Sequence, residues 1–237
     1  MKENLVPEIK GNLRNNFLEV PSEINQVNGI KIFGKNIKSI VFSTDVAIIK
    51  NVNADAVLAV YPFTPQPIIN QAVIMTADVP VFSGVGGCHT FDKNRVLNLA
   101  LHAEFQGAIG VVLNATVSNE LIESVAKKID IPVVVTIASN KDDITGRIDA
   151  GALILNVSAS IDTPFVVDKI KSRYPDIAVM ATGGPTSQTV VDTINAGADA
   201  ITWTPPTTGE LFKPTMTYCR NQFGIGKYET MISSEDK

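Results

Sequence analysis

Eight short runs of Val, Ile and Leu recur along the chain, and most of them start about two dozen residues after the previous one. A run that is apolar at every position is typical of a strand covered on both faces, as in parallel sheets whose crossovers are helices. The runs span residues 39–44, 56–61, 81–84, 109–114, 133–137, 153–158, 177–182 and 200–204. The pattern therefore predicts eight parallel strands.

The segments between these runs carry helical periodicity. After the fourth run, apolar residues from Leu121 to Ile129 recur at helical spacing, and Ser118 stands where an N-cap is expected. Similar stripes follow the sixth and seventh runs, at 166–174 and 190–194. A βα unit that repeats eight times closes into a barrel, whereas an open doubly wound sheet usually has fewer strands. We therefore expect an α/β fold, a closed (β/α)8 TIM barrel, with the open sheet as the alternative.

The length of the chain fits one such domain. A barrel takes roughly 250 residues, and the 237 residues are 45% hydrophobic and 19% charged, enough to bury a large core. We expect one domain over 1–237, with an extension at 1–38 that caps the barrel, the barrel at 39–225 and a tail at 226–237. Asn28-Gly29 predicts a hairpin turn in the extension, and Thr207 to Glu210 has the form of a capping box that starts a helix.

Charge and composition exclude several kinds of partner. The net charge is -4, the isoelectric point is about 5.2, and the basic residues are scattered, which argues against a nucleic-acid partner. No apolar stretch approaches the roughly 20 residues of a membrane span, and the first residues lack the apolar core of a signal peptide. We expect a cytoplasmic protein without a membrane partner, free Cys88 and Cys219 thiols, and a homo-oligomer as one possibility.

The carboxyl ends of the strands are where chemistry is expected, because barrels of this kind place their sites there. The residues that end the apolar runs are mostly small and polar, which suits ligand binding. The candidate ligand-binding residues are Gly86, Gly87, Asn114, Thr136, Asn156, Thr182, Gly183, Gly184, Thr186, Thr204 and Thr207. Among them, Asn114, Thr136 and Asn156 are expected to orient a substrate.

The pair Gly183-Gly184 lies between a predicted strand and a predicted helix. Glycines at such a place let backbone N–H groups approach an anion at the helix N-terminus. Thr186 and Thr207 are expected to help hold that anion. The alternative is that the two glycines only form a tight turn between the strand and the helix.

The segment from Ala181 to Gly184, followed by a short helix and Ala196 to Ala200, resembles the seventh and eighth units of phosphate-binding barrels. That group includes ketodeoxyphosphogluconate-type aldolases, sugar-phosphate epimerases and decarboxylases, and glycerol-operon antiterminator proteins. The resemblance covers residues 177–212 and implies a small phosphorylated or anionic ligand. In members of that group, the eighth strand is commonly followed by two small residues, Gly-Ser or a similar pair, whose backbone amides complete the phosphate site. Here Pro205 and Pro206 stand at this place and have no N–H. The amides of 207–209 are the expected replacement.

His89 is the candidate for proton transfer, because it follows the glycine-rich third run and imidazole exchanges protons near neutral pH. An ordinary loop histidine is the alternative.

Asp45 directly follows the first run and is a candidate base or partner of His89, or else the N-cap of the first helix. Cys88 is a weaker candidate nucleophile, since neighbours on an extended segment point to opposite sides. Asp45 and His89 alone are too few for a metal site.

The expected function is a small-molecule enzyme of lyase or isomerase type. It would act on a phosphorylated or anionic metabolite by proton transfer next to a carbonyl, without a cofactor. No lysine ends any run, which disfavours a Schiff-base aldolase, and the Asp-x-Lys-x-x-Asp strand of orotidine-phosphate-type decarboxylases is missing. The alternatives are a non-catalytic ligand sensor, as the antiterminator resemblance allows, and a flavin-binding barrel, because related enzymes hold flavin phosphate in the same two loops.

Overall fold

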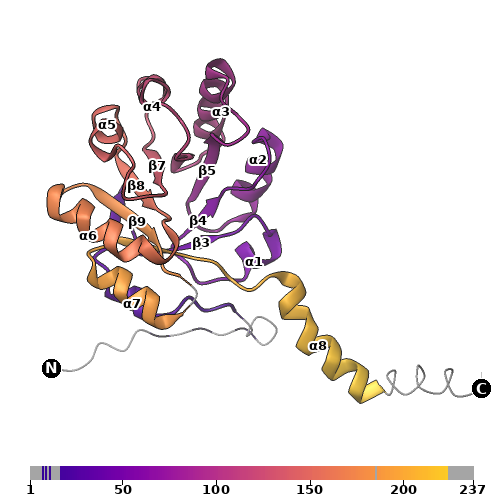
Figure 1. Cartoon of the computed structure of the whole chain (residues 1–237). Coiled ribbons are helices and arrows are strands. Elements are labelled where there is room, and N and C mark those ends of the chain that lie inside the picture. Colours follow the sequence, from indigo (N-terminus) through magenta and orange to yellow (C-terminus); the bar gives the residue numbers. More distant parts are fainter. Residues whose placement is uncertain (1–6, 8, 10, 12–16, 185, 224–237) are drawn as a thin grey trace, which may run out of the picture. The chain divides into compact units, whose positions relative to one another are not determined.

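The chain forms a closed barrel of eight parallel strands. The computed structural model describes residues 7, 9, 11, 17–184 and 186–223. The strands are β3 (Ser39–Phe42), β4 (Ala56–Ala59), β5 (Val81–Gly86), β6 (Gly110–Leu113), β7 (Val133–Ile137), β8 (Ile154–Val157), β9 (Ala178–Thr182) and β10 (Ala200–Trp203). They follow one another around the barrel, and β10 pairs with β3 to close it (Figure 1). The predicted (β/α)8 TIM barrel is confirmed, and the open sheet is wrong.

Helices connect consecutive strands, as the periodicity predicts. They are α1 (Val46–Lys50), α2 (Pro67–Thr76), α3 (Lys93–Phe105), α4 (Asn119–Ala126), α5 (Ile144–Asp149), α6 (Thr163–Arg173) and α7 (Ser187–Asn195), with a short 3-10 turn, η2 (Ser160–Asp162), before α6. Figure 1 shows α2 to α6 around the outside of the strands. The Ser118 hydroxyl accepts the Leu121 amide at 3.3 Å, so the predicted N-cap of α4 is confirmed.

Strand residues alternate between two cores, because successive side chains of a strand point to opposite faces. Positions such as Ile154 and Ala200 belong to a cluster inside the barrel, whereas their neighbours Leu155 and Ile201 pack with the helices outside. The alternation explains why the runs are apolar throughout. It also means that Asn156, two residues beyond Ile154, continues the inward-facing series.

A hairpin precedes the barrel, but its turn lies elsewhere than predicted. After a 3-10 turn, η1 (Ser22–Gln26), the antiparallel strands β1 (Ile30–Ile32) and β2 (Lys35–Ile37) are joined by Phe33 and Gly34. Both of these residues have positive φ, 45° and 82°, as the preferred two-residue hairpin turns require. The prediction of a turn at Asn28-Gly29 is wrong, because the Gly29 amide donates to the carbonyl of Asp199 and joins the hairpin to the barrel.

The hairpin packs against the inside of the barrel. Ile30, Ile32 and Ile37 belong to the same buried cluster as the inward-facing strand residues. The Asp55 carboxylate, just before β4, accepts the amides of Lys38 and Ser39 at 2.9 and 3.0 Å and so fixes the passage from β2 into β3. The hairpin therefore covers the amino-terminal ends of the strands.

Residues 205–237 form a second compact unit, separate from the unit of residues 1–204. It contains α8 (Thr208–Phe223). The Thr207 amide donates to the Glu210 carboxylate at 2.7 Å, and the Glu210 amide donates to the Thr207 hydroxyl at 3.2 Å, so the predicted capping box is confirmed. The single domain expected over 1–237 stays a prediction, and the tail at 226–237 lies outside the described residues. No helix in the described part of the chain is long and apolar enough to cross a membrane.

We expect Ile37→Ala to destabilise the barrel by about 2–5 kcal/mol, because the substitution leaves a cavity where a fully buried side chain packs. Urea denaturation followed by circular dichroism measures the change. Lys31→Ala is the control on the same hairpin, since Lys31 is exposed. Equal unfolding midpoints for the two variants would show that the hairpin adds nothing to the stability of the barrel.

Candidate functional site

A cavity of about 520 Å³ lies at the carboxyl ends of the strands. All eight strands, or the loops that follow them, contribute to its lining, which consists of Phe42, Leu58, Val60, Tyr61, Pro62, Phe63, Pro65, residues 84–89, Val112, Asn114, Thr136, Asn156, Ser158, Thr182, Thr202 and Thr204. The volume is typical of small-molecule sites. The cavity therefore lies at the end of the barrel where the sequence predicts a ligand site.

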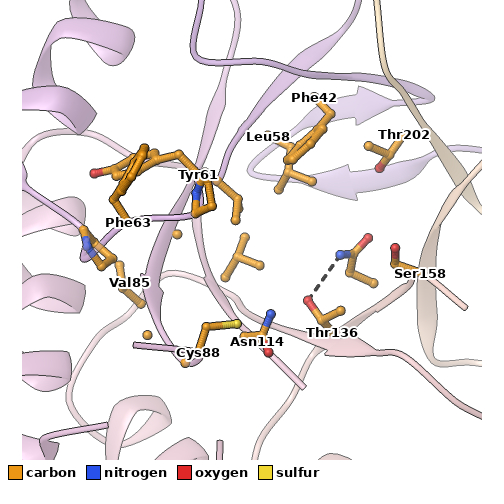
Figure 2. Close-up of a pocket in the computed structure, with 18 of the residues that line it drawn as sticks. Phe42, Leu58, Tyr61, Phe63, Val85, Cys88, Asn114, Thr136, Ser158 and Thr202 are labelled. Atoms are coloured by element: carbon orange, nitrogen blue, oxygen red, sulfur yellow. Dashed lines mark hydrogen bonds between the residues drawn. The ribbon is translucent and has the colours of Figure 1, made fainter. Parts of the chain in front are cut away.

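One side of the cavity is apolar and aromatic. Phe42, Leu58, Val60, Tyr61 and Phe63, here called the apolar wall, come from β3, β4 and the loop after β4. Figure 2 shows Tyr61 and Phe63 on one side of the cavity and Thr136, Ser158 and Thr202 on the other. The Tyr61 hydroxyl accepts the Gln66 amide at 2.8 Å, which ties the wall to the start of α2.

The opposite side is polar but uncharged. Thr136 and Asn156 are paired in register on β7 and β8, and the Asn156 side-chain amide donates to the Thr136 hydroxyl at 3.3 Å (Figure 2). The Asn156 Oδ1 and the Thr202 Oγ1 are buried and have no hydrogen-bond partner within the described residues. These two oxygens therefore remain available to a molecule in the cavity.

The glycine-rich loop after β5 brings Cys88 and His89 to the cavity. A register shift between Gly84 and Gly86 marks a bulge at the end of β5. Gly87 has φ 104°, and a Cβ there would lie 2.3 Å from the Cβ of Asn114, so only glycine fits. Gly87 and Thr90 exchange two backbone hydrogen bonds of 3.0 Å. The resulting turn exposes Cys88 and His89 on the cavity lining.

Asn114 fixes this loop to the end of β6. Its side-chain oxygen accepts both the amide and the hydroxyl of Thr116 at 3.2 Å. The Thr116 hydroxyl in turn accepts the Cys88 amide at 3.0 Å. Cys88 has a positive φ of 53°, which is uncommon outside glycine, and these contacts hold it there. Asn114 therefore orients the loop that carries His89, in addition to lining the cavity.

Asp45 caps a helix and does not line the cavity to which His89 belongs. Its carboxylate accepts the amides of Ala47 and Ile48 at 2.9 and 3.3 Å and caps α1, and it is not among the residues that line the cavity. The N-cap is one of the two roles that the sequence allows for this residue. A catalytic role for Asp45 stays a prediction without support from this geometry.

The predicted anion-binding loop also lies outside the cavity lining. The Gly183 amide donates to the Thr202 carbonyl at 3.1 Å, and the Thr186 amide and hydroxyl form a capping box with Thr189. A Cβ on Gly184 would lie 2.5 Å from the Thr189 hydroxyl, which explains this glycine by packing. Anion binding here stays a prediction, with fewer amides to offer than expected.

Thr207, expected to complete the anion site, belongs to the second unit. Both its amide and its hydroxyl donate to the Glu210 carboxylate, at 2.7 and 2.8 Å. These two hydrogen bonds, the one from the amide first, hold the pKa of Glu210 below its usual value. A role for Thr207 in binding a ligand stays a prediction. Among the residues that the structure describes, no group of three His, Cys, Asp or Glu side chains is placed to hold a metal ion.

Of the predicted site residues, eight line the cavity. They are Gly86, Gly87, His89, Asn114, Thr136, Asn156, Thr182 and Thr204. Sequence reasoning missed the apolar wall, Ser158 and Thr202. Thr202 could have been identified from the sequence, because it lies two residues before Thr204 and so faces the same side of the strand. The apolar wall gave no signal, since apolar residues at strand ends look like core residues in a sequence.

Comparison with known proteins supports the fold and no family. No protein-family model and no curated protein sequence matches the chain. Three similar solved structures are a mandelate oxidase mutant with a monooxide FMN adduct, an aldolase, and a dihydrodipicolinate synthase from Agrobacterium tumefaciens.

The mandelate oxidase is 17% identical, with a TM-score of 0.58 over 76% of this chain and 69% of that one. The aldolase is 18% identical, with a TM-score of 0.54 over 70% and 88%. The synthase is 13% identical, with a TM-score of 0.54 over 90% and 82%. At these identities the likeness shows that the chain shares the TIM-barrel fold with these enzymes.

Replacing Asp45 separates its two candidate roles. We expect Asp45→Ala to lower the free energy of unfolding by about 0.5–2 kcal/mol, because α1 loses its cap. Asp45→Ser keeps a capping oxygen and should unfold close to the wild type in urea. If the serine variant is as unstable as the alanine variant, the carboxylate does more than cap α1.

Proposed function

We propose that this chain is a small-molecule enzyme of lyase or isomerase type that transfers a proton next to a carbonyl, with His89 as the proton carrier. The observation that carries the proposal is the position of His89, on an anchored turn that lines a cavity built from all eight strand ends. Imidazole is the side chain best suited to take up and return a proton near neutral pH. The TIM-barrel enzymes among the similar structures, which include an aldolase and a synthase, are compatible with this chemistry.

The polar side of the cavity supplies what such a reaction needs besides a base. When the imidazole takes a proton from the carbon next to a carbonyl, negative charge develops on the carbonyl oxygen. A hydroxyl or amide donor fixed beside that oxygen stabilises it. Thr202, Thr136 and Asn156 offer such donors on rigid strands. The imidazolium then returns the proton to the product.

The geometry favours an uncharged substrate over the phosphorylated or anionic one expected from the sequence. No lysine, arginine, aspartate or glutamate stands among the described residues of the lining. An anion taken out of water without a cation beside it is strongly disfavoured. The proposed substrate therefore differs in charge from the one that the resemblance implies.

A flavin-binding barrel is a weaker candidate. The mandelate oxidase structure holds an FMN adduct, but the residues here do not suit the phosphate of such a group. The Gly183 amide donates its hydrogen bond to the Thr202 carbonyl, and the Thr186 amide donates to the Thr189 hydroxyl, so neither is available to a phosphate. The described lining also contains no lysine or arginine that could balance the phosphate charge. We therefore assign no step to a flavin.

A ligand sensor without catalysis remains the second candidate function. It is favoured by the small number of titratable groups in the described lining, which are Tyr61, Cys88 and His89. A sensor and an enzyme would both bind a ligand in this cavity. Only the enzyme would move a proton between the ligand and solvent.

Exchange with heavy water tests the proposal even while the natural substrate is unidentified. In D₂O, the wild-type protein should catalyse loss of the proton signal next to the carbonyl of a suitable uncharged ketone, followed by proton NMR. His89→Ala should slow this exchange about 10²–10⁴-fold, the usual contribution of a general base. His102→Ala is the matched control, because His102 is the other histidine of the chain and lies on α3. Equal rates in the wild type and His89→Ala would rule out His89 as the proton carrier, and binding without exchange would favour the sensor.

A further inference from the structure

Two buried oxygens face the cavity without a partner. Asn156 is 7% exposed and Thr202 is 3% exposed, and the Oδ1 of the first and the Oγ1 of the second make no hydrogen bond to any described residue. The large majority of buried side-chain polar atoms in native proteins are paired, because an unpaired one loses its hydration without compensation. Both residues line the cavity from strand positions that point into the barrel. This combination indicates a place for a bound polar group.

The hydrogen-bonding capacity of the two oxygens defines that group. The Asn156 Oδ1 only accepts, so it calls for an N–H or O–H, whereas the Thr202 hydroxyl both donates and accepts. A polar head that carries both a donor and an acceptor can pair with these two groups, which β8 and β10 contribute on either side of β9. Such a head also pairs with the Asn156 amide in either of its two orientations.

The surroundings define the rest of the molecule. The described lining holds no charged side chain to balance a carboxylate, phosphate or ammonium group, so the head is uncharged. The apolar wall offers aromatic and branched faces to the rest of the molecule. Figure 2 shows Tyr61 and Phe63 on the side of the cavity opposite Thr202, whereas Phe42 and Leu58 lie on the same side as Thr202. An apolar body placed there leaves water, and this favours binding.

We propose that Asn156 and Thr202 form the subsite for the head of an uncharged ligand, a hydroxyl next to a carbonyl, whose aromatic or branched aliphatic body rests on the apolar wall. That this ligand is the substrate rests on the proposed function, because proton transfer by His89 requires a carbonyl whose neighbouring carbon carries a hydrogen, and the carbon that bears the hydroxyl can supply it. The binding itself does not depend on His89.

Three related probes test the ligand class. 2-Hydroxyacetophenone has the ring, the carbonyl and the hydroxyl, acetophenone lacks the hydroxyl, and mandelate has the ring and hydroxyl but carries a carboxylate. Binding at millimolar concentration is measured by ligand-observed NMR. We expect 2-hydroxyacetophenone to bind about tenfold more tightly than acetophenone, the factor of one hydrogen bond, and mandelate and inorganic phosphate to bind more weakly than either ketone.

Two apolar replacements of similar shape test the subsite. Thr202→Val and Asn156→Leu should each weaken 2-hydroxyacetophenone about tenfold or more. The matched control is Thr90→Val. Thr90 is also 3% exposed, and its hydroxyl makes no hydrogen bond to the residues that the structure describes, but it does not line the cavity. Both Thr→Val variants should unfold at or slightly above the wild-type temperature, since each removes an unpaired buried oxygen. Thermal unfolding thus confirms that the variants are folded.

The inference is overturned if 2-hydroxyacetophenone does not bind, if mandelate or phosphate binds more tightly, or if Thr202→Val binds the ketone as well as Thr90→Val does. The last result would mean that the two oxygens only hold water. His89→Ala tests the proposed function separately, because it leaves Asn156 and Thr202 unchanged. If that variant binds the ketone and exchanges protons as fast as the wild type, the proposed function alone is contradicted. The subsite is supported if Thr202→Val and Asn156→Leu no longer bind 2-hydroxyacetophenone more tightly than acetophenone.

Discussion

The pairing of β10 with β3, which sets Ile201 beside Ser39 and Trp203 beside Val41, turns eight parallel strands into a closed ring. Because the ring is closed and parallel, every strand ends on the same rim, and residues far apart in the chain come to share one cavity. The hairpin with Ile30 and Ile37 fills the other end. The cavity lies at the opposite end of the ring, where the candidate residues meet.

The character of the cavity follows from where the inward-facing positions change from apolar to polar. On β8 the change occurs between Ile154 and Asn156, and on β10 between Ala200 and Thr202. On β3 and β4 it does not occur, and the inward series ends in the apolar wall. The same alternation that builds the core thus divides the cavity into an uncharged polar side and an apolar side.

Several predicted site residues make hydrogen bonds that support the backbone. Asp45 caps α1, Thr186 caps α7, and the Gly183 amide is bonded to the neighbouring strand. Short polar side chains at strand ends are suited both to capping and to catalysis, because both depend on a carboxylate or hydroxyl beside free amides. His89 differs, since it stands on a turn of its own, held by contacts of Gly87 and by the link from Cys88 to Thr116.

The barrel, its eight strands and the rim where the candidate site lies could be predicted from the order of residues alone, because apolar runs and helical stripes report burial directly. The same order also identified Asn156 and Thr136, since polar residues at the end of a buried strand stand out. The three-dimensional contacts were needed to show which polar groups are already hydrogen-bonded, as Asp45 is, and which, such as the Thr202 hydroxyl, have no hydrogen-bond partner among the described residues. The same contacts revealed the apolar wall and showed that the hairpin turns at Phe33 and Gly34. Both depend on contacts between distant segments, which local sequence patterns do not record.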